Sequence, residues 1–256
     1  MGQNNYVEIA LKHNMQPQIF VGFGGACCAG QRADGERGGV IIFDCDGVLV
    51  DSEVIACSLL AQMITGLGRP ISVKETMTRF LGRSQKDVLV EIEGLIGRKL
   101  APEEGEADAR RLMQRFREEL QPVQGVRAAI LAVPGKRCVA SSSSPDRLRY
   151  SLELTGLLDL FDPHVFSAAQ VKNGKPAPDL FLLAARTCGA QPQVCIVVED
   201  SPAGVTAARA AGMRAVGFVG ASHGSPELGE RLRLAGAALV IDDMRALPGA
   251  VAGLMS

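Results

Sequence analysis

The chain has 256 residues, of which 47% are hydrophobic, so it is long enough for one large domain or for a core with a smaller insert. Its formal net charge of -1 gives no sign of a nucleic-acid or anionic-membrane partner, and no apolar stretch approaches the roughly 18 residues that span a bilayer. The seven cysteines are scattered and show no CxxC spacing, which favours reduced thiols and a cytoplasmic location over a disulfide framework.

Residues 1–39 differ from the rest of the chain because they are rich in glycine and show little hydrophobic periodicity after Phe23. They predict an N-terminal extension that is partly disordered. The run 22–27 resembles a dinucleotide-binding loop only loosely, because the third glycine and the strand-turn-helix context are missing. The apolar piece 19–21 could add an edge strand or mediate self-association.

An apolar run at 39–43 predicts a buried strand, and the acidic run Asp44-Cys45-Asp46-Gly47 follows it directly. In an open parallel sheet, ligands bind beyond the carboxyl ends of the strands, and side-chain alternation lets Asp44 and Asp46 project toward one pocket. Paired carboxylates at such a place indicate metal or acid/base chemistry. The alternative for this run is a polar turn after the strand.

Residues 53–121 carry apolar residues at helical spacing, for example Ile55, Leu59 and Met63. Prolines interrupt this stretch and Pro122 closes it, so we expect a small helical bundle that caps the strand ends. The predicted division of the chain is an extension at 1–39, a catalytic core at 40–51 and 122–256, and a helical cap at 52–121.

Beyond Pro122, short apolar runs alternate with amphipathic helices. The predicted strands lie at 137–140, 164–167, 194–198, 215–219 and 238–241. The predicted helices lie at 145–158, 178–188 and 201–211. This βαβ rhythm predicts an α/β fold with a doubly wound parallel, Rossmann-like sheet and an inserted helical cap.

A serine run and a lysine follow two of these strands. Ser141, Ser142, Ser143 and Ser144 offer hydroxyl and backbone N–H groups to an anion at the start of a helix, although Ser144 before a proline is also a good helix N-cap. Lys175 stands in the run Asn-Gly-Lys-Pro-Ala-Pro-Asp, whose prolines restrict the backbone, so a rigidly aimed ammonium fits a phosphate. The alternative for Lys175 is a solvated loop residue.

Glu199 and Asp200 repeat the design of the first strand, because acids again follow a buried apolar run. Two acids there could simply start the next helix. Together with Asp44 and Asp46, however, Asp200 completes an all-oxygen site suited to Mg²⁺, a hard cation that binds carboxylates, water and phosphate.

These four runs, DCDGVLVDSE, the serine run, GKPAPD and VVEDSPAG, resemble in this order the four motifs of the haloacid dehalogenase superfamily. The resemblance covers residues 40–245 and is to the β-phosphoglucomutase-like branch with a helical cap. It implies that Asp44 is the nucleophile that forms an aspartyl-phosphate and that Asp46 is the general acid/base. It also implies that Ser141 and Lys175 hold the phosphoryl group, and that Mg²⁺ is bound by Asp44, the Asp46 backbone carbonyl and Asp200, with support from Glu199.

The resemblance leaves open which reaction is catalysed. Asp46 favours phosphate-ester chemistry over the branches of the superfamily that lack this second acid. The β-phosphoglucomutases carry a histidine and an arginine where this chain has Ala56 and Gln85. A mutase must restrain the attack of water on the aspartyl-phosphate, and the absence of these two residues weakens that restraint. We therefore expect a phosphatase for a small phosphorylated sugar, polyol or sugar acid. The alternatives are a phosphohexomutase and a non-catalytic binding protein on the same fold.

Substrate specificity is expected in the cap, because the core supplies only phosphate and metal contacts. The candidate substrate loop is 80–84, in which Arg83 either reads a hydroxyl or carboxylate or forms an exposed salt bridge. Glu53 either contacts substrate or caps the first cap helix. The further candidate substrate-binding residues are Ser142 and Ser143, and His13, His164 and His223 are assigned a structural role. The expected partner is a small-molecule phosphate ester, and the expected state a monomer or weak homodimer.

Overall fold

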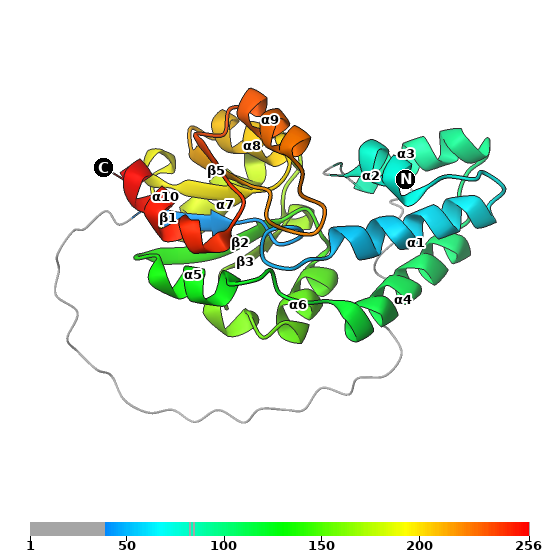
Figure 1. The fold of residues 1–256 in the computed structure, drawn as a ribbon, viewed down its shortest axis with the longest axis horizontal. Helices are drawn as coiled ribbons and strands as arrows, with labels where there is room; N and C mark the ends of the chain where they lie inside the picture. The colour runs from blue at the N-terminus through cyan, green and yellow to red at the C-terminus, as the bar shows by residue number, and fades with distance from the viewer. Residues whose placement is uncertain (1–38, 82, 84, 256) are drawn as a thin grey trace.

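The computed structural model describes residues 39–81, 83 and 85–255 (Figure 1). The predicted extension at 1–39 lies outside the described residues except for Gly39, and so do His13 and two of the cysteines. The candidate substrate loop is described only in part, and the side chain of Gln85 is not described.

A six-stranded sheet forms the centre of the structure, with the strand order β3-β2-β1-β4-β5-β6 and every neighbouring pair parallel. The strands are β1 (Val40–Phe43), β2 (Lys136–Ser141), β3 (Val165–Ser167), β4 (Ile196–Glu199), β5 (Arg214–Phe218) and β6 (Leu239–Ile241). In the centre of the sheet, Phe43 pairs with Val139 on one side and with Val198 on the other. The predicted doubly wound α/β fold is confirmed.

Helices cover both faces of the sheet (Figure 1), and the side chains of β1 are therefore buried on both faces. Ile41 and Phe43 pack into the core shared with α5, α6 and α10, whereas Val40 and Ile42 pack into the core shared with α7, α8 and α9. These helices are α5 (Val126–Ala132), α6 (Pro145–Leu154), α7 (Asp179–Thr187), α8 (Pro202–Ala210), α9 (Pro226–Ala235) and α10 (Leu247–Met255). Strands that are buried on both faces have continuous apolar sequences. Their sequences therefore show no alternation of apolar and polar residues that would distinguish one face from the other.

Of the five helices between β1 and β2, the first four form a bundle to one side of the sheet (Figure 1). They are α1 (Glu53–Gly66), α2 (Val73–Phe80), α3 (Gln85–Ile96) and α4 (Pro102–Glu119). The bundle has a small core of its own around Ile64, Phe80 and Ile92. The chain enters and leaves it where the Asp51 N–H donates to the Gln121 carbonyl. We refer to residues 52–121 as the cap.

The element boundaries differ from the predicted ones by more than one residue in two places. The strand expected from Val194 begins at Ile196, because Pro192–Val194 form a 3-10 turn. The helix expected to run to 158 ends at Leu154, shortly before Gly156, whose φ of 65° does not continue a helix. Three helices were not predicted at all, namely α5, α9 and α10. Helix α10, with the sequence LPGAVAGLM, has no polar face that would produce an amphipathic pattern.

Two expectations from the composition can be compared with the structure. All five cysteines of the described residues, Cys45, Cys57, Cys138, Cys188 and Cys195, are free and buried. Among the described residues, no helix has both the length and the apolar character needed to cross a membrane.

Candidate active site

The sheet brings the predicted acidic residues together at one edge. The chain starts the sheet at β1, fills one side with β2 and β3 and then crosses to β4 on the other side, so β1 and β4 flank the topological switch point. Asp44 follows β1 and Asp200 follows β4, and the Asp44 N–H donates to the Val198 carbonyl at 2.9 Å. Ligands bind in the crevice beyond such a switch point.

Lys175 is the centre of the hydrogen-bond network at this edge. Its buried Nζ donates to Asp44 Oδ1 at 2.6 Å, to Glu199 Oε1 at 2.6 Å and to the Ala140 carbonyl at 3.0 Å. It also lies 5.0 Å from the ring centroid of Phe181. Burial acts to lower the pKa of Lys175, but Asp44 and Glu199 outweigh it and raise that pKa above its ordinary value. Lys175 is therefore a fixed cation, and the solvated-loop alternative is wrong.

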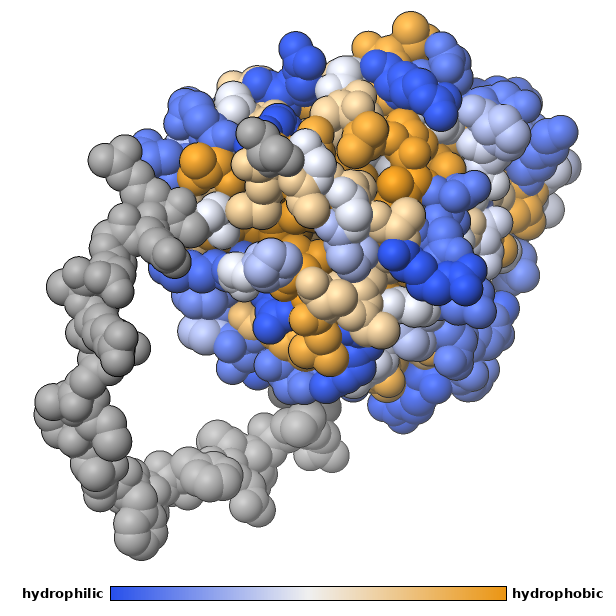
Figure 2. Space-filling view, turned by 60° about the vertical axis from the view of Figure 1, so that its left-hand side comes forward, coloured by the Kyte–Doolittle hydropathy of each residue, from blue (hydrophilic) through white to orange (hydrophobic). Residues whose placement is uncertain are grey.

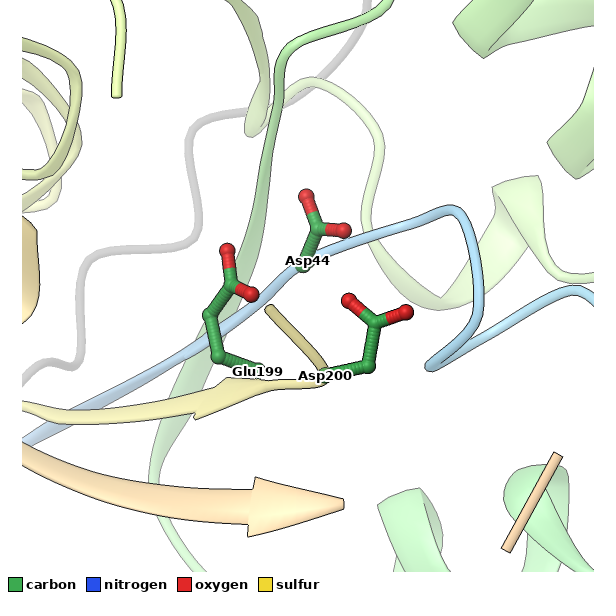
Figure 3. A group of neighbouring side chains, drawn as sticks. All are labelled: Asp44, Glu199 and Asp200. Carbon is green, nitrogen blue, oxygen red and sulfur yellow. The ribbon is translucent and has the colours of Figure 1, made fainter. Parts of the chain in front are cut away.

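Three buried carboxylates face one another beside this ammonium (Figure 3). Asp44, Glu199 and Asp200 each offer a carboxylate oxygen, and these oxygens lie within 4.8 Å of one another. Burial, followed by the neighbouring acids, raises the pKa of Asp200 well above its usual range, and burial raises the pKa of Asp44 although Lys175 acts against it. When all three carboxylates are ionised, the single lysine leaves the cluster with a formal charge of minus two. An oxygen-rich pocket of this charge fits Mg²⁺.

Glu199 serves Lys175 more than the open part of the cluster. One of its oxygens accepts from Lys175, and the other accepts from the backbone N–H and the hydroxyl of Ser201, each at 2.9 Å. Ser201 is also the N-cap of α8 and accepts from the Gly204 N–H. Ser201, at the start of α8, therefore holds the Glu199 carboxylate in place, and Glu199 in turn holds Lys175.

Asp46 lies in a different environment from Asp44, although only one residue separates them. Its carboxylate accepts from Ser52 Oγ at 2.6 Å, from Ser143 Oγ at 2.6 Å and from Arg147 Nη2 at 2.8 Å. Burial acts to raise the pKa of Asp46, but Arg147 and the two hydroxyl groups outweigh it and lower that pKa. Arg147 in turn lies over the Phe116 ring at 5.3 Å from its centroid. Asp46 is thus held as a carboxylate between cap and core.

The four serines of the predicted anion site occupy three different environments. Ser141 is buried and accepts from the Ser143 N–H at 3.0 Å, and the Ser143 carbonyl accepts from Ser167 Oγ at 2.6 Å. Ser142 is exposed. Ser144 is the N-cap of α6, as its alternative assignment predicted.

The two cap candidates are placed differently. Glu53 is the first residue of α1. Its burial, followed by the negative charges of Asp46 and Asp200, raises its pKa to about 7. The guanidinium of Arg83 contacts Glu91 within the cap and remains 41% exposed. The salt-bridge alternative therefore describes Arg83, and the structure does not bring it to the residues at the strand ends.

Two residues beside the acidic cluster were not predicted as site residues: Arg147, and His223, for which only a structural role was expected. Arg147 carried a usable signal, because a cation in the first turn of a helix opposes the helix dipole and needs an anionic partner. The sequence gives no such signal for His223. Its Nε2 lies 2.9 Å from Asp200 Oδ2 only because the fold brings the loop after β5 next to the end of β4.

Comparison with known proteins agrees with this geometry. The family described as haloacid dehalogenase-like hydrolase matches residues 39–212. The 6-phosphogluconate phosphatase of Escherichia coli is 31% identical over 73% of this chain and 85% of its own length. The phosphorylated carbohydrates phosphatase of Thermotoga maritima is 32% identical over 69% of this chain and 82% of its own length.

Among solved structures, a haloacid dehalogenase-like protein of unknown function from Agrobacterium tumefaciens is 40% identical, with a TM-score of 0.76. The match covers 86% of this chain and all of that protein.

The packing of Gly204 against Glu199 yields a stability prediction. A Cβ at Gly204 would overlap the Glu199 carboxylate, which Lys175 and Ser201 hold in place. We expect Gly204→Ala to lower the free energy of unfolding by about 1–3 kcal/mol, measured by urea denaturation. The matched control is Gly249→Ala at the third position of α10, where a Cβ meets nothing within 4 Å, and there we expect a gain of about 0.5–1 kcal/mol. Equal effects of the two substitutions would contradict this role of Gly204.

Proposed function

The chain belongs to the haloacid dehalogenase-like hydrolases, and on that basis we propose that it is a Mg²⁺-dependent phosphatase for small phosphorylated sugars, polyols or sugar acids. The observation that carries the proposal is the buried network in which Lys175 joins Asp44 to Glu199 beside Asp200. The named activities of the two curated relatives support the substrate class.

Asp44 is the proposed nucleophile. One of its oxygens attacks phosphorus, the bond from phosphorus to the ester oxygen breaks, and that oxygen takes a proton from Asp46. Asp46 then removes a proton from a water molecule that attacks the phosphorylated Asp44. The bond between phosphorus and the Asp44 oxygen breaks, inorganic phosphate leaves, the Asp44 carboxylate is restored and Asp46 is protonated again. Splitting the reaction in this way replaces one difficult step by two easier ones.

A dianionic substrate must approach a nucleophile that is itself negative. Mg²⁺, when bound by Asp44, Asp200 and the Asp46 carbonyl, supplies positive charge that offsets this repulsion. Lys175 supplies a second positive charge, and Ser141 with the N–H groups of the serine run supplies hydrogen bonds to the phosphoryl oxygens.

Lys175 has no spare donor in the resting arrangement, because its three ammonium protons already serve Asp44, Glu199 and the Ala140 carbonyl. A phosphoryl oxygen that binds Lys175 must replace or share one of them. The neutral Ala140 carbonyl has the longest of the three contacts and is the partner that is easiest to exchange.

Specificity for the leaving group is proposed for the groups above Asp46. Glu53 is in part protonated near neutral pH, so it can donate to a substrate hydroxyl or accept from one. Beside Asp46, Arg147 presents a buried Nε that has no hydrogen-bond partner among the described residues. Both groups suit a polyhydroxylated leaving group better than an apolar one.

Asp44→Asn tests the nucleophile. The amide keeps the shape of the side chain but is a poor nucleophile, so we expect kcat for phosphate release to fall by at least about a thousandfold. A malachite-green assay across phosphorylated sugars and polyols with Mg²⁺ measures this. The control is Asp159→Asn, an exposed aspartate paired with Arg127, which should keep wild-type kcat. Mg²⁺-dependent phosphate release that persists in folded Asp44→Asn would refute the assignment.

Arg147→Gln tests the electrostatic environment of Asp46. Arg147 lowers the pKa of Asp46, so its removal should raise that pKa and keep the proton donor protonated to a higher pH. We expect the falling alkaline limb of the pH profile of kcat/KM to move to higher pH. Arg149→Gln, two residues further along α6 and 53% exposed, is the control and should leave the profile in place. An unchanged profile in Arg147→Gln would show that Asp46 does not limit this limb.

The phosphohexomutase alternative can be separated from the phosphatase by products. We expect ³¹P NMR of β-glucose 1-phosphate with a trace of glucose 1,6-bisphosphate to show inorganic phosphate forming first. Ala56 on α1 offers no polar group that could restrain water attack on the phosphorylated Asp44. If glucose 6-phosphate appears faster than free phosphate, the chain is a mutase.

A further inference from the structure

His223 lies in a position that packing alone does not explain. Its side chain is fully buried, and neither ring nitrogen has an aligned hydrogen-bond partner among the described residues. A buried polar group left in this state is unfavourable, and an apolar side chain of similar volume would fill the space at lower cost. Yet Nε2 is 2.9 Å from Asp200 Oδ2, which is the length of a hydrogen bond, so a small rotation of either group would align the N–H with the oxygen.

The backbone of Gly47 packs closely against these two side chains. Gly47, with a φ of 77°, fills the space beside them, and a Cβ there would overlap Asp200 Oδ2 and come within 2.7 Å of His223 Cε1. The loop after β1, the end of β4 and the loop after β5 therefore meet at this contact.

The loop that carries His223 is itself anchored to the cap crossing. The backbone N–H of Ser222 donates to Asp51 Oδ1 at 3.2 Å, and its hydroxyl donates to Asp51 Oδ2. Close packing shapes the same loop, since a Cβ at Gly220 would overlap the Asp242 carbonyl and one at Gly224 would overlap the Val219 carbonyl. His223 thus lies in a closely packed loop whose preceding residue, Ser222, is hydrogen-bonded to Asp51.

His223 is an outer partner of the acidic cluster and not a member of it. The residues whose candidate ligand atoms lie within 4.8 Å of one another are Asp44, Glu199 and Asp200, all from strand ends. Outer hydrogen-bond partners orient metal-binding carboxylates, and their loss commonly weakens metal affinity about 10- to 100-fold.

We propose that His223 is a positioning residue for the cation site: its Nε2 holds Oδ2 of Asp200 and fixes the direction in which that carboxylate faces Asp44. The role deepens the proposed function, since it concerns the same divalent-cation site. The loop after β5 thereby links the cap crossing at Asp51 to the acidic cluster.

The test uses His223→Leu in the full-length protein with Mn²⁺ as probe, counting free ion by EPR in the absence of substrate. Mn²⁺ suits the same oxygen ligands as Mg²⁺. We expect the Mn²⁺ dissociation constant to rise about tenfold or more, and the Mg²⁺ concentration for half-maximal activity to rise by a similar factor. At saturating Mg²⁺, kcat should stay near wild type, because the nucleophile and Lys175 are untouched.

Two further variants make the outcome specific. His223→Gln keeps an N–H donor close to the position of Nε2 and should retain affinity within about threefold. His164→Gln changes the other described histidine, which lies outside the site before β3, and should bind Mn²⁺ as the wild type does. Wild-type affinity in folded His223→Leu, or equal losses in the Leu and Gln variants, would overturn the proposal.

If thermal unfolding shows that His223→Leu does not fold, Ser222→Ala decides. Loss of the hydroxyl bond to Asp51 should loosen the loop and weaken Mn²⁺ binding by about threefold, and unchanged affinity would overturn the proposal. Mn²⁺ binding is measured without substrate, so the two proposals can fail separately. If the wild type hydrolyses no phosphate ester but the variant binds Mn²⁺ more weakly, the phosphatase is refuted and the role of His223 stands. If the wild type is a phosphatase but the variant binds Mn²⁺ with unchanged affinity, the role of His223 is refuted and the phosphatase stands.

Discussion

The buried ammonium of Lys175 is the interaction on which the rest of the site depends. Three carboxylates beyond β1 and β4 could not remain ionised together in a buried pocket without positive charge. Lys175 binds two of them, and its own burial is tolerable only because both are present. The remaining negative charge, concentrated at Asp44 and Asp200, suits a dication, which under the proposed function offsets the charge of a phosphate ester.

Much of this arrangement could be predicted from sequence because it depends on strand order alone. Apolar runs ending in Asp44 or Glu199 place acids at the carboxyl ends of parallel strands, and those ends meet at one edge whatever the details of packing. The contacts of His223 and Arg147 could not be derived in the same way. They depend on how a loop after β5 folds back and on where cap residue Phe116 rests, and no local pattern encodes either.

One crossing between cap and core contacts residues of the candidate site directly. Asp51 binds the loop after β5, and the next residue, Ser52, donates to Asp46. Consecutive residues at one crossing therefore contact both the loop that carries His223 and the carboxylate of Asp46, the proposed acid/base. Small backbone rotations at such crossings are the usual origin of cap closure, so a movement of the cap would change both contacts together.

The opposite environments of the two aspartates place a constraint on the order of events. Asp44 has a raised pKa and Asp46 a lowered one, so the resting site suits Asp46 as a base that activates water. It does not suit Asp46 as the acid that must protonate the leaving oxygen in the first step. For that step Asp46 must give up hydrogen bonds from Arg147 or the two serines, and one of those serines stands at the cap crossing. Under the proposed function, proton donation by Asp46 therefore requires a rearrangement of these contacts, and the contact with Ser52 lies at the crossing between cap and core.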